Sequence, residues 1–328
     1  MKKDIIFEDS LVFEVYVIGY KEKGESIVLL LKADRKPVFA GLVDCYQDDV
    51  QNEALYILRN SGREYFDFVC WTHPHEDHTI GLDSVLSNYC SDETSFWMPM
   101  GIEISDLPVS KYSREVKKTY QKLYEIITSR KRKKLHVNQA ANRMRLECFK
   151  CRKTNGISNY EFAIHSFAPS GEIITQNEVK DIFTASNDFS IGLLITIGEF
   201  GILLASDVEN RTFDIIPEMD LEGNLDYIKI PHHASPTGDA LVRKLRNMNV
   251  IAPSVATTTV YRNHRLPNPY VVETYKKWDS ELKVFSSGHS NKEDDLDRIG
   301  VIRTEFDILL KDPVPITVSL EGNAVELL

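Results

Sequence analysis

Segment 72–78 holds the residues with the clearest potential for chemistry. It reads Thr-His-Pro-His-Glu-Asp-His, which places three imidazoles and two carboxylates in seven residues. His73 and His75 are two positions apart, so extended backbone can direct both imidazoles to the same side. Asp77 and His78 are adjacent and can serve a second centre close by. Imidazole and carboxylate groups bind zinc, and also manganese or iron. The spacing therefore predicts the beginning of a two-metal site.

The alternative is a polar surface loop that is rich in histidine by chance. The chain has nine histidines in 328 residues, and chance rarely places three of them this close together. The flanking residues also favour a built site. Residues 66–71 read as a short buried strand, and residues 79–88 carry apolar side chains at helical spacing. A loop between a strand and a helix is a common place for a rigid scaffold to display reactive side chains.

The pattern His73-x-His75-x-Asp77-His78 resembles the His-x-His-x-Asp-His signature of the metallo-β-lactamase superfamily, and Thr-Ile-Gly-Leu follows it as in many members. The resemblance implies an α/β fold, a four-layer αβ/βα sandwich in which two mixed β-sheets are flanked by helices. It also implies two divalent metal ions, Zn2+ in the first place and Mn2+ as the second choice. The likeness spans nearly the whole chain, so we expect a single domain over residues 1–328 with a helical, basic insertion at about 100–142. Within it, residues 21–25 read as a charged turn and residues 251–255 as a strand. Residues 316–320 and 324–327 read as a closing hairpin over Gly322 and Asn323.

Two aspartates at the ends of expected strands match further positions of the superfamily. Residues 38–43 read as a strand that leads to Asp44, and the resemblance implies that this carboxylate supports the metal ligands from behind. A simple turn aspartate is the alternative. Residues 191–197 and 202–207 read as a hairpin, whose second strand delivers Asp207. Superfamily members have there an aspartate that bridges both metals, although its usual glycine neighbour is Ser206 in this chain.

Residues 231–235 read Pro-His-His-Ala-Ser and resemble the Pro-His-His-Gly-Ser segment of the hydrolase domain in DNA-uptake competence proteins of the ComEC type. Ala234 replaces the glycine. One of His232 and His233 should bind metal, with His232 favoured, and the other would donate a proton or bind substrate. Residues 261–269 resemble the Asn-x-x-Gly-His-Pro segment of the same branch. This likeness implies that His264 completes the second metal site or lies over the substrate.

The expected site follows from these segments. Many superfamily members supply a third histidine to the first metal, and the candidates here are His136, which follows a basic run, and His165, which alternates within a strand. The competence branch often lacks this ligand, so neither is carried over. The expected catalytic residues are Asp77, Asp207 and His264. The expected metal ligands are His73, His75, Asp77, His78, Asp207, His232 and His233.

The composition limits the ligands and the cellular compartment that we expect for this chain. The chain is 42% hydrophobic and 27% charged, with a formal net charge of −10, which weighs against broad electrostatic binding of nucleic acid. No apolar run reaches the ~18 residues of a membrane span, and acidic residues interrupt the first apolar stretch, so we expect neither a membrane nor a signal peptide. The five cysteines are odd in number and scattered, which favours a reducing, cytoplasmic setting. Cys148-x-x-Cys151 has no partner pair, so ordinary thiols are expected there.

One segment is basic, although the chain as a whole is acidic. Lysine and arginine concentrate between Lys111 and Lys134, where residues 113–127 read as a long helix and residues 130–134 are Arg-Lys-Arg-Lys-Lys. A solvated helix face that ends in a basic cap is one interpretation. A patch that meets phosphates is the other. In the second interpretation, the substrate-binding residues are Lys131, Arg132, Lys133 and Lys134.

Two metals about 3.5–4 Å apart lower the pKa of a shared water, which makes hydroxide available at neutral pH. We therefore expect a hydrolase that uses a metal-bound hydroxide, first of all a phosphodiesterase or nuclease acting on DNA or RNA. One alternative is the hydrolysis of a small phosphoester, nucleotide, lactone or thioester, which the acidic balance favours. Another is an effector or scaffold subunit of a multi-protein system, with protein partners. β-Lactam hydrolysis is not expected, because a fold does not fix its function.

Overall fold

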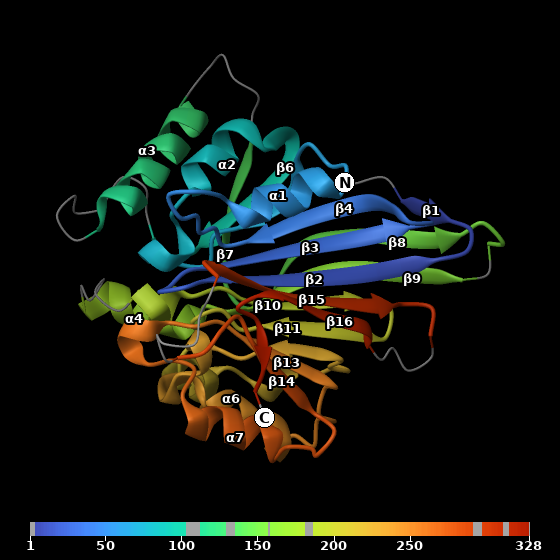
Figure 1. Cartoon of the computed structure of the whole chain (residues 1–328). Coiled ribbons are helices and arrows are strands. Elements are labelled where there is room, and N and C mark those ends of the chain that lie inside the picture. The colour runs from blue at the N-terminus through green and yellow to red at the C-terminus, as the bar shows by residue number, and fades with distance from the viewer. Residues whose placement is uncertain are drawn as a thin grey trace.

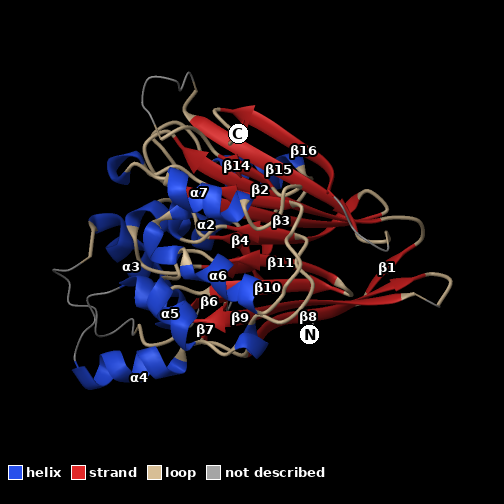
Figure 2. Cartoon of the chain, turned by 90° about the horizontal axis from the view of Figure 1, so that it is seen from below, coloured by secondary structure: helices blue, strands red, loops and turns tan. Residues whose placement is uncertain are grey.

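Two mixed β-sheets lie face to face at the centre of the molecule, and helices cover the outer face of each (Figure 1, Figure 2). The computed structural model describes residues 4–102, 112–128, 135–156, 158–180, 186–290, 297–310 and 315–327. Its layers follow the order helices, sheet, sheet, helices. The expected four-layer αβ/βα sandwich is thereby confirmed.

The first sheet is antiparallel on one side and parallel on the other. The direction of pairing changes at β4. The strands from β16 to β4 pair antiparallel, and those from β4 to β7 pair parallel. In order across the sheet, its strands are β16 (Pro315–Gly322), β15 (Ile299–Asp307), β2 (Leu11–Tyr20), β3 (Glu25–Ala33), β4 (Lys36–Val43), β5 (Phe66–Cys70), β6 (Cys90–Pro99) and β7 (His136–Ala140).

The second sheet has the same division into two kinds of pairing. Strands β8 to β11 pair antiparallel, and β11 to β14 pair parallel. In order across the sheet, its strands are β1 (Ile5–Phe7), β8 (Met144–Lys153), β9 (Asn159–Ala168), β10 (Gly192–Ile197), β11 (Phe200–Leu204), β12 (Tyr227–Lys229), β13 (Val255–Thr258), β14 (Lys283–Ser286) and β17 (Val325–Glu326).

The helices divide between the two outer faces, as Figure 1 shows. Those from the first part of the chain cover the first sheet: α1 (Glu53–Asn60), α2 (Leu82–Asn88) and α3 (Arg114–Thr128). Those from the second part cover the second sheet: α5 (Asn210–Ile215), α6 (Ala240–Asn247) and α7 (Pro269–Lys276). Helix α4 (Gly171–Lys180) follows β9. None of the helices in the described ranges is long and apolar enough to cross a membrane.

Three apolar layers hold these four layers together. Strand β3 illustrates the pattern, because it is apolar on both faces. Ile27, Leu29 and Leu31 pack between the sheets, whereas Val28 and Leu30 pack under the helices of the first sheet. Successive side chains of a strand point to opposite faces, so a strand covered on both sides must be apolar at nearly every position. The continuous apolar runs of the sequence therefore belong to strands in the middle of the sandwich.

Two expectations about secondary structure were wrong. Residues 251–255 were expected to form a strand, but β13 begins only at Val255, and Ile251 is 82% exposed. Pro253 explains the late start, because proline has no N–H to give to a sheet. The chain end was expected to form a hairpin around residue 322. Instead, β16 pairs with β15 in the first sheet and β17 pairs with β14 in the second. Each tail segment thus forms an edge strand of a different sheet.

A buried carboxylate in the first sheet gives the fold a testable response to acid. Glu14 is 1% exposed, and its Oε1 lies 2.7 Å from Nζ of Lys32 and 2.5 Å from an Nη atom of Arg303. Burial raises the pKa of Glu14, but the hydrogen bonds and charges of Lys32 and Arg303 outweigh it and lower the pKa below its usual 4.5. The stabilisation from this carboxylate is therefore complete above about pH 4.5 and is lost as the pH falls through the lower, folded-state value.

Glu14→Gln should lower the free energy of unfolding at pH 7 by about 1–3 kcal/mol, the scale of hydrogen bonds to charged groups. It should also flatten the loss of stability on acidification, as urea unfolding between pH 7 and pH 3 would measure. Glu305→Gln is the matched control, because Glu305 contacts the same Arg303 and its pKa is raised rather than lowered. An unchanged acid response in Glu14→Gln would contradict the assignment.

Candidate metal centre

The candidate site lies at the carboxyl ends of parallel strands in both sheets. Asp44 follows β4, and the histidine-rich segment 72–78 follows β5 in the first sheet. Asp207 comes soon after β11, and His232 and His233 come soon after β12 in the second. Strands β4 and β5 are in register up to Val43 and Cys70, and β11, β12 and β13 align equally well. Open α/β sheets bind their ligands outside such strand ends, so the topology brings together residues far apart in sequence.

The loop after β5 is fixed by its own hydrogen bonds. The indole Nε1 of Trp71 donates to Oγ1 of Thr79 at 2.9 Å, and this hydroxyl donates to the carbonyl of His75 at 2.5 Å. Residues Glu76–His78 form a short 3-10 helix, which turns Asp77 and His78 into the protein. Nε2 of His73 and Nδ1 of His75 end 3.0 Å apart. The two imidazoles therefore converge, as their spacing predicted.

Asp207 lies at the centre of the site. Its Oδ2 is 3.6 Å from Nε2 of His73 and 3.6 Å from Nε2 of His78. Asp207, His73 and His75 form one cluster whose ligand atoms all lie within 4.8 Å of one another. Asp207 is 2% exposed. One carboxylate thus faces imidazoles on two sides.

A second cluster lies beside Asp207. It consists of Asp77, His78 and His233, whose ligand atoms also lie within 4.8 Å of one another. Oδ2 of Asp77 is 3.5 Å from Nε2 of His78 and 3.3 Å from Nε2 of His233. Oδ1 of Asp207 lies 3.8 Å from the same atom of His233. Of the histidine pair, His233 is therefore the one that joins Asp77 and His78, although His232 was favoured from the sequence.

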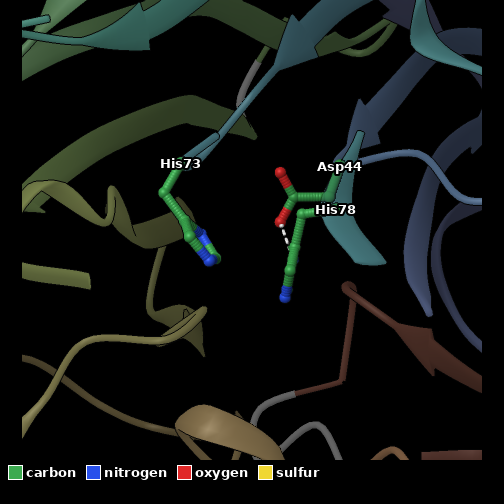
Figure 3. Close-up of side chains that lie close together, drawn as sticks. All are labelled: Asp44, His73 and His78. Atoms are coloured by element: carbon green, nitrogen blue, oxygen red, sulfur yellow. Dashed lines mark hydrogen bonds and ion pairs between the residues drawn. The ribbon is translucent and has the colours of Figure 1, made fainter. Parts of the chain in front are cut away.

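Asp44 lies behind His78, as Figure 3 shows. Its Oδ2 is 2.7 Å from Nδ1 of His78, and the backbone N–H and hydroxyl of Thr72 donate to the same carboxylate at 2.8 and 2.6 Å. Since Nδ1 of His78 faces Asp44, its Nε2 faces the cluster. A carboxylate on the far ring nitrogen orients a metal-binding imidazole and raises its basicity. The supporting role of Asp44 stays a prediction, and this contact is the geometry that it requires.

The clusters contain buried polar atoms without hydrogen-bond partners in the described part of the chain, and a positive ion would satisfy them. Among the residues that the structure describes, Nε2 of His78, Nε2 of His233 and Oδ1 of Asp207 are buried without a hydrogen-bond partner. Buried polar atoms in native proteins are normally satisfied, and the exceptions need an explanation. These atoms face one another around Asp207, and imidazole and carboxylate are ligands of Zn2+ and Mn2+. The donor set therefore fits divalent metal ions.

The ionisation of the site points the same way. Burial, with the charges of His78 and His75, holds the pKa of His73 well below its usual value, so His73 is neutral and its ring can bind metal. Burial also lowers the pKa of His78, but the carboxylates of Asp207, Asp44 and Asp77 outweigh it and raise this pKa well above the usual value. A proton on His78 thus balances the surrounding carboxylates, and a cation would do the same.

His232 has a different environment from His233. Its Nδ1 lies 2.7 Å from Oγ1 of Thr237 and 3.1 Å from Oε1 of Glu209. Its Nε2 points towards Oδ2 of Asp207, 3.7 Å away, and the side chain is 20% exposed. Burial lowers the pKa of His232, but the carboxylates of Asp207 and Glu209 raise it above its usual value. His232 therefore combines a carboxylate partner with access to the open side of the site.

The open side is a cleft of about 620 Å³. His264 lines this cleft, and its ring packs on Tyr261 at 4.7 Å between centroids. Its place over the substrate stays a prediction. Lys23 and Glu76 form an ion pair of 2.8 Å on the cleft wall. The other lining residues are His75, Asp77, Asp207, His232, Ser235, Pro236, Thr237, Leu266 and Asn268.

Several candidates from the sequence lie elsewhere. His136 is exposed at the start of β7, and His165 is half-buried in β9; neither belongs to a cluster of ligand atoms among the described residues. Cys148 and Cys151 are free thiols on one strand. The expected substrate-binding residues Lys131, Arg132, Lys133 and Lys134 lie outside the described residues.

The sequence analysis did not identify Glu25, Thr259 and Glu209, which contact His233 or His232, or Lys229, which pairs with Glu25. Glu25 was assigned to a charged turn, yet it begins β3 and is 1% exposed. Lys229 and Thr259 are fully buried, and Glu209 contacts His232. A lysine inside the apolar run of residues 227–230 was the available signal, because a lysine is almost never fully buried unless it is paired.

Comparisons with known proteins add little to this picture. No protein-family model and no curated protein sequence matches the chain. Among solved structures, the chain is similar to a diphosphatase described as from the PhnP family, with 13% identity over 91% of this chain and 100% of that chain and a TM-score of 0.42. It is also similar to a mutant of the CmlA β-hydroxylase, with 13% identity over 75% of this chain and 45% of that chain and a TM-score of 0.40. Neither likeness assigns an activity to this chain.

Proposed function

We propose that this chain is a metal-dependent hydrolase of the metallo-β-lactamase superfamily that cleaves phosphoester bonds with two divalent ions. The observation that supports it best is the convergence of buried, unpartnered ligand atoms around Asp207 among the described residues. His73, His75 and Asp207 would hold one ion. Asp77, His78 and His233 would hold the second, which also shares Asp207.

The residues around the clusters have separate tasks in such a reaction. Two bound ions would supply an activated water and neutralise charge on the substrate oxygens. Asp44 holds the ring of His78 at its Nδ1, 2.7 Å away. His232 faces the cleft with its Nε2 while Glu209 and Thr237 hold its Nδ1. We assign to His232 the transfer of a proton to the leaving oxygen rather than metal binding.

The cleft favours a small phosphoester as substrate. Its volume of about 620 Å³ is within the range of small-molecule sites. Lys23 on its wall is a cation that an anionic substrate can draw away from Glu76. On α3, Lys118 pairs with Glu115 at 2.9 Å and Lys122 with Glu125 at 3.6 Å, which reduces the positive charge of the described part of the basic segment.

Nucleic acid is the second candidate substrate, and the basic run at residues 130–134 is the feature that favours it. This run follows α3 in the sequence, and Ser113, which immediately precedes α3, hydrogen-bonds with Glu76 on the cleft wall. A chain of phosphates that enters the cleft could therefore continue along α3. A cytoplasmic setting and protein partners stay predictions from the sequence.

One experiment tests the proposal and separates the two substrates. The metal content of the purified chain is measured by mass spectrometry, and cleavage of bis(4-nitrophenyl) phosphate, dinucleotides and labelled DNA and RNA is followed with added Zn2+ or Mn2+. We expect about two ions per chain, as in other two-metal hydrolases, and cleavage of the small diesters that responds little to salt. Cleavage of nucleic acid as the main activity would instead fall steeply with rising salt.

Neutral glutamine in place of residues 130–134 serves as the matched control. It should leave the small diesters unaffected, and it should slow only the cleavage of long nucleic acid. A chain that binds no metal under any condition would contradict the proposal. A metal-loaded chain that hydrolyses lactones or thioesters but no phosphoester would keep the site and overturn the proposed substrate class.

A further inference from the structure

A buried ion pair lies directly behind the second cluster. Nζ of Lys229 and Oε2 of Glu25 are 2.8 Å apart, and the two side chains are 0% and 1% exposed. Glu25 begins β3 of the first sheet, whereas Lys229 ends β12 of the second. Two charges removed from water at this depth are costly unless they are well paired. The pair therefore joins the two halves of the sandwich at one point, beside the candidate metal centre.

Thr259 connects this ion pair to His233. Its Oγ1 lies 2.5 Å from Oε2 of Glu25 and 2.8 Å from Nδ1 of His233. A hydroxyl has a single proton to donate, and the carboxylate of Glu25 can only accept. Thr259 therefore donates to Glu25 and accepts the proton of His233 Nδ1. In this arrangement Nε2 of His233 carries a free electron pair, and it is the atom that faces Asp77 and Asp207.

The backbone of His233 needs such a restraint. His232, His233 and Ala234 have φ values of 48°, 51° and 58°, so three consecutive non-glycine residues adopt the left-handed conformation. Residues in this region persist only when their surroundings hold them there. The side chain of His233 is thus attached to backbone in an unfavourable conformation. Thr259 is its hydrogen-bond partner on the side away from the cluster.

We propose that Glu25, Thr259 and Lys229 are positioning residues, which fix the tautomer and direction of His233 so that this residue of the second sheet meets Asp77 and His78 of the first. This inference rests on the proposed function, since it assigns the three residues to the second metal centre. Asp44 supports His78 by direct contact, whereas Glu25 reaches His233 through the hydroxyl of Thr259. The relay therefore depends on one hydroxyl group, which can be removed without disturbing either charge.

Thr259→Val tests the relay, because valine keeps the shape of threonine and leaves the Glu25–Lys229 pair intact. Zn2+ affinity is measured by competition with a chromogenic chelator for each of the two equivalents. We expect the affinity for one equivalent to fall about 10- to 100-fold, the usual effect of removing a partner of a metal-binding histidine. The other equivalent should bind as in the wild type. Thr259→Ser restores the hydroxyl and should recover the wild-type affinity.

Thr258→Val is the matched control. Thr258 is also fully buried, and its Oγ1 has no hydrogen-bond partner among the residues that the structure describes, so both metal affinities should stay unchanged. If Thr259→Val does not fold, the double variant Glu25→Met with Lys229→Met decides, since it removes the carboxylate and its partner charge together and should weaken the same equivalent. Wild-type affinity in Thr259→Val, or in the double variant, would overturn the relay while two ions still bind. A wild-type chain without any ion would overturn the proposed function itself.

Discussion

Asp207→Asn should abolish the binding of both ions and reduce hydrolysis by at least about 10³-fold. The reason is geometric: the carboxylate of Asp207 faces His73 and His78 with Oδ2 and His233 with Oδ1, at 3.6–3.8 Å. Asparagine has the same shape but sets an N–H donor against one of these sides and carries no charge. Bound metal contributes several kcal/mol to the transition state, and each 1.36 kcal/mol corresponds to a factor of ten in rate.

Metal content and turnover of the preferred substrate, both at saturating metal, provide the measurement. His165→Ala is the matched control, because it removes a half-buried imidazole of the second sheet that lies outside both clusters, and it should keep two ions.

Two neighbouring variants refine the prediction. His233→Ala should lose one ion, whereas His232→Ala should keep both and lose about 10²- to 10⁴-fold in turnover, the usual contribution of a proton-transfer residue. Full metal occupancy in Asp207→Asn would contradict a bridging role.

The parts of the site that could be predicted are those that follow from local sequence. His73, His75, Asp77 and His78 lie in one loop after one strand, so their spacing alone indicated that they converge. Asp207 was placed by the resemblance to the superfamily, in which an aspartate follows the second strand of such a hairpin. The apolar run of residues 66–71 also indicated a buried strand, because strands that are covered on both faces are apolar throughout.

The remaining features depend on contacts that local sequence does not encode. The choice between His232 and His233 depends on a left-handed turn of three non-glycine residues. His232 was favoured as the metal ligand, whereas His233 is the histidine that lies in a cluster with Asp77 and His78. Glu25 meets Thr259 across 234 positions of the chain, and no periodicity reveals such a pairing. The tail was misread for the same reason, since two short strands joined by a turn resemble a hairpin until the sheet edges that they form are known.

Lys229→Met should destabilise the fold by about 3–5 kcal/mol, because it leaves the carboxylate of Glu25 buried without its charged partner. The free energy of unfolding in urea at pH 7 provides the measurement. Lys277→Met is the matched control: Lys277 also pairs with a glutamate, Glu273 at 3.5 Å, but the two side chains are 69% and 53% exposed. Exposed pairs contribute about 0–1 kcal/mol, so the control should change little. A similar small loss in Lys229→Met would show that water or another group compensates Glu25.

The double variant Glu25→Met with Lys229→Met then separates the effect on stability from the effect on the position of His233. Replacing both partners of a buried ion pair by neutral groups is often neutral or stabilising, so we expect most of the stability lost in the single variant to return. The carboxylate that accepts the proton of Thr259 is nevertheless absent, so the second ion should still bind weakly. Recovery of stability without recovery of metal affinity would mean that the pair serves to align His233. Recovery of both would mean that Thr259 and the backbone hold this histidine without help from Glu25.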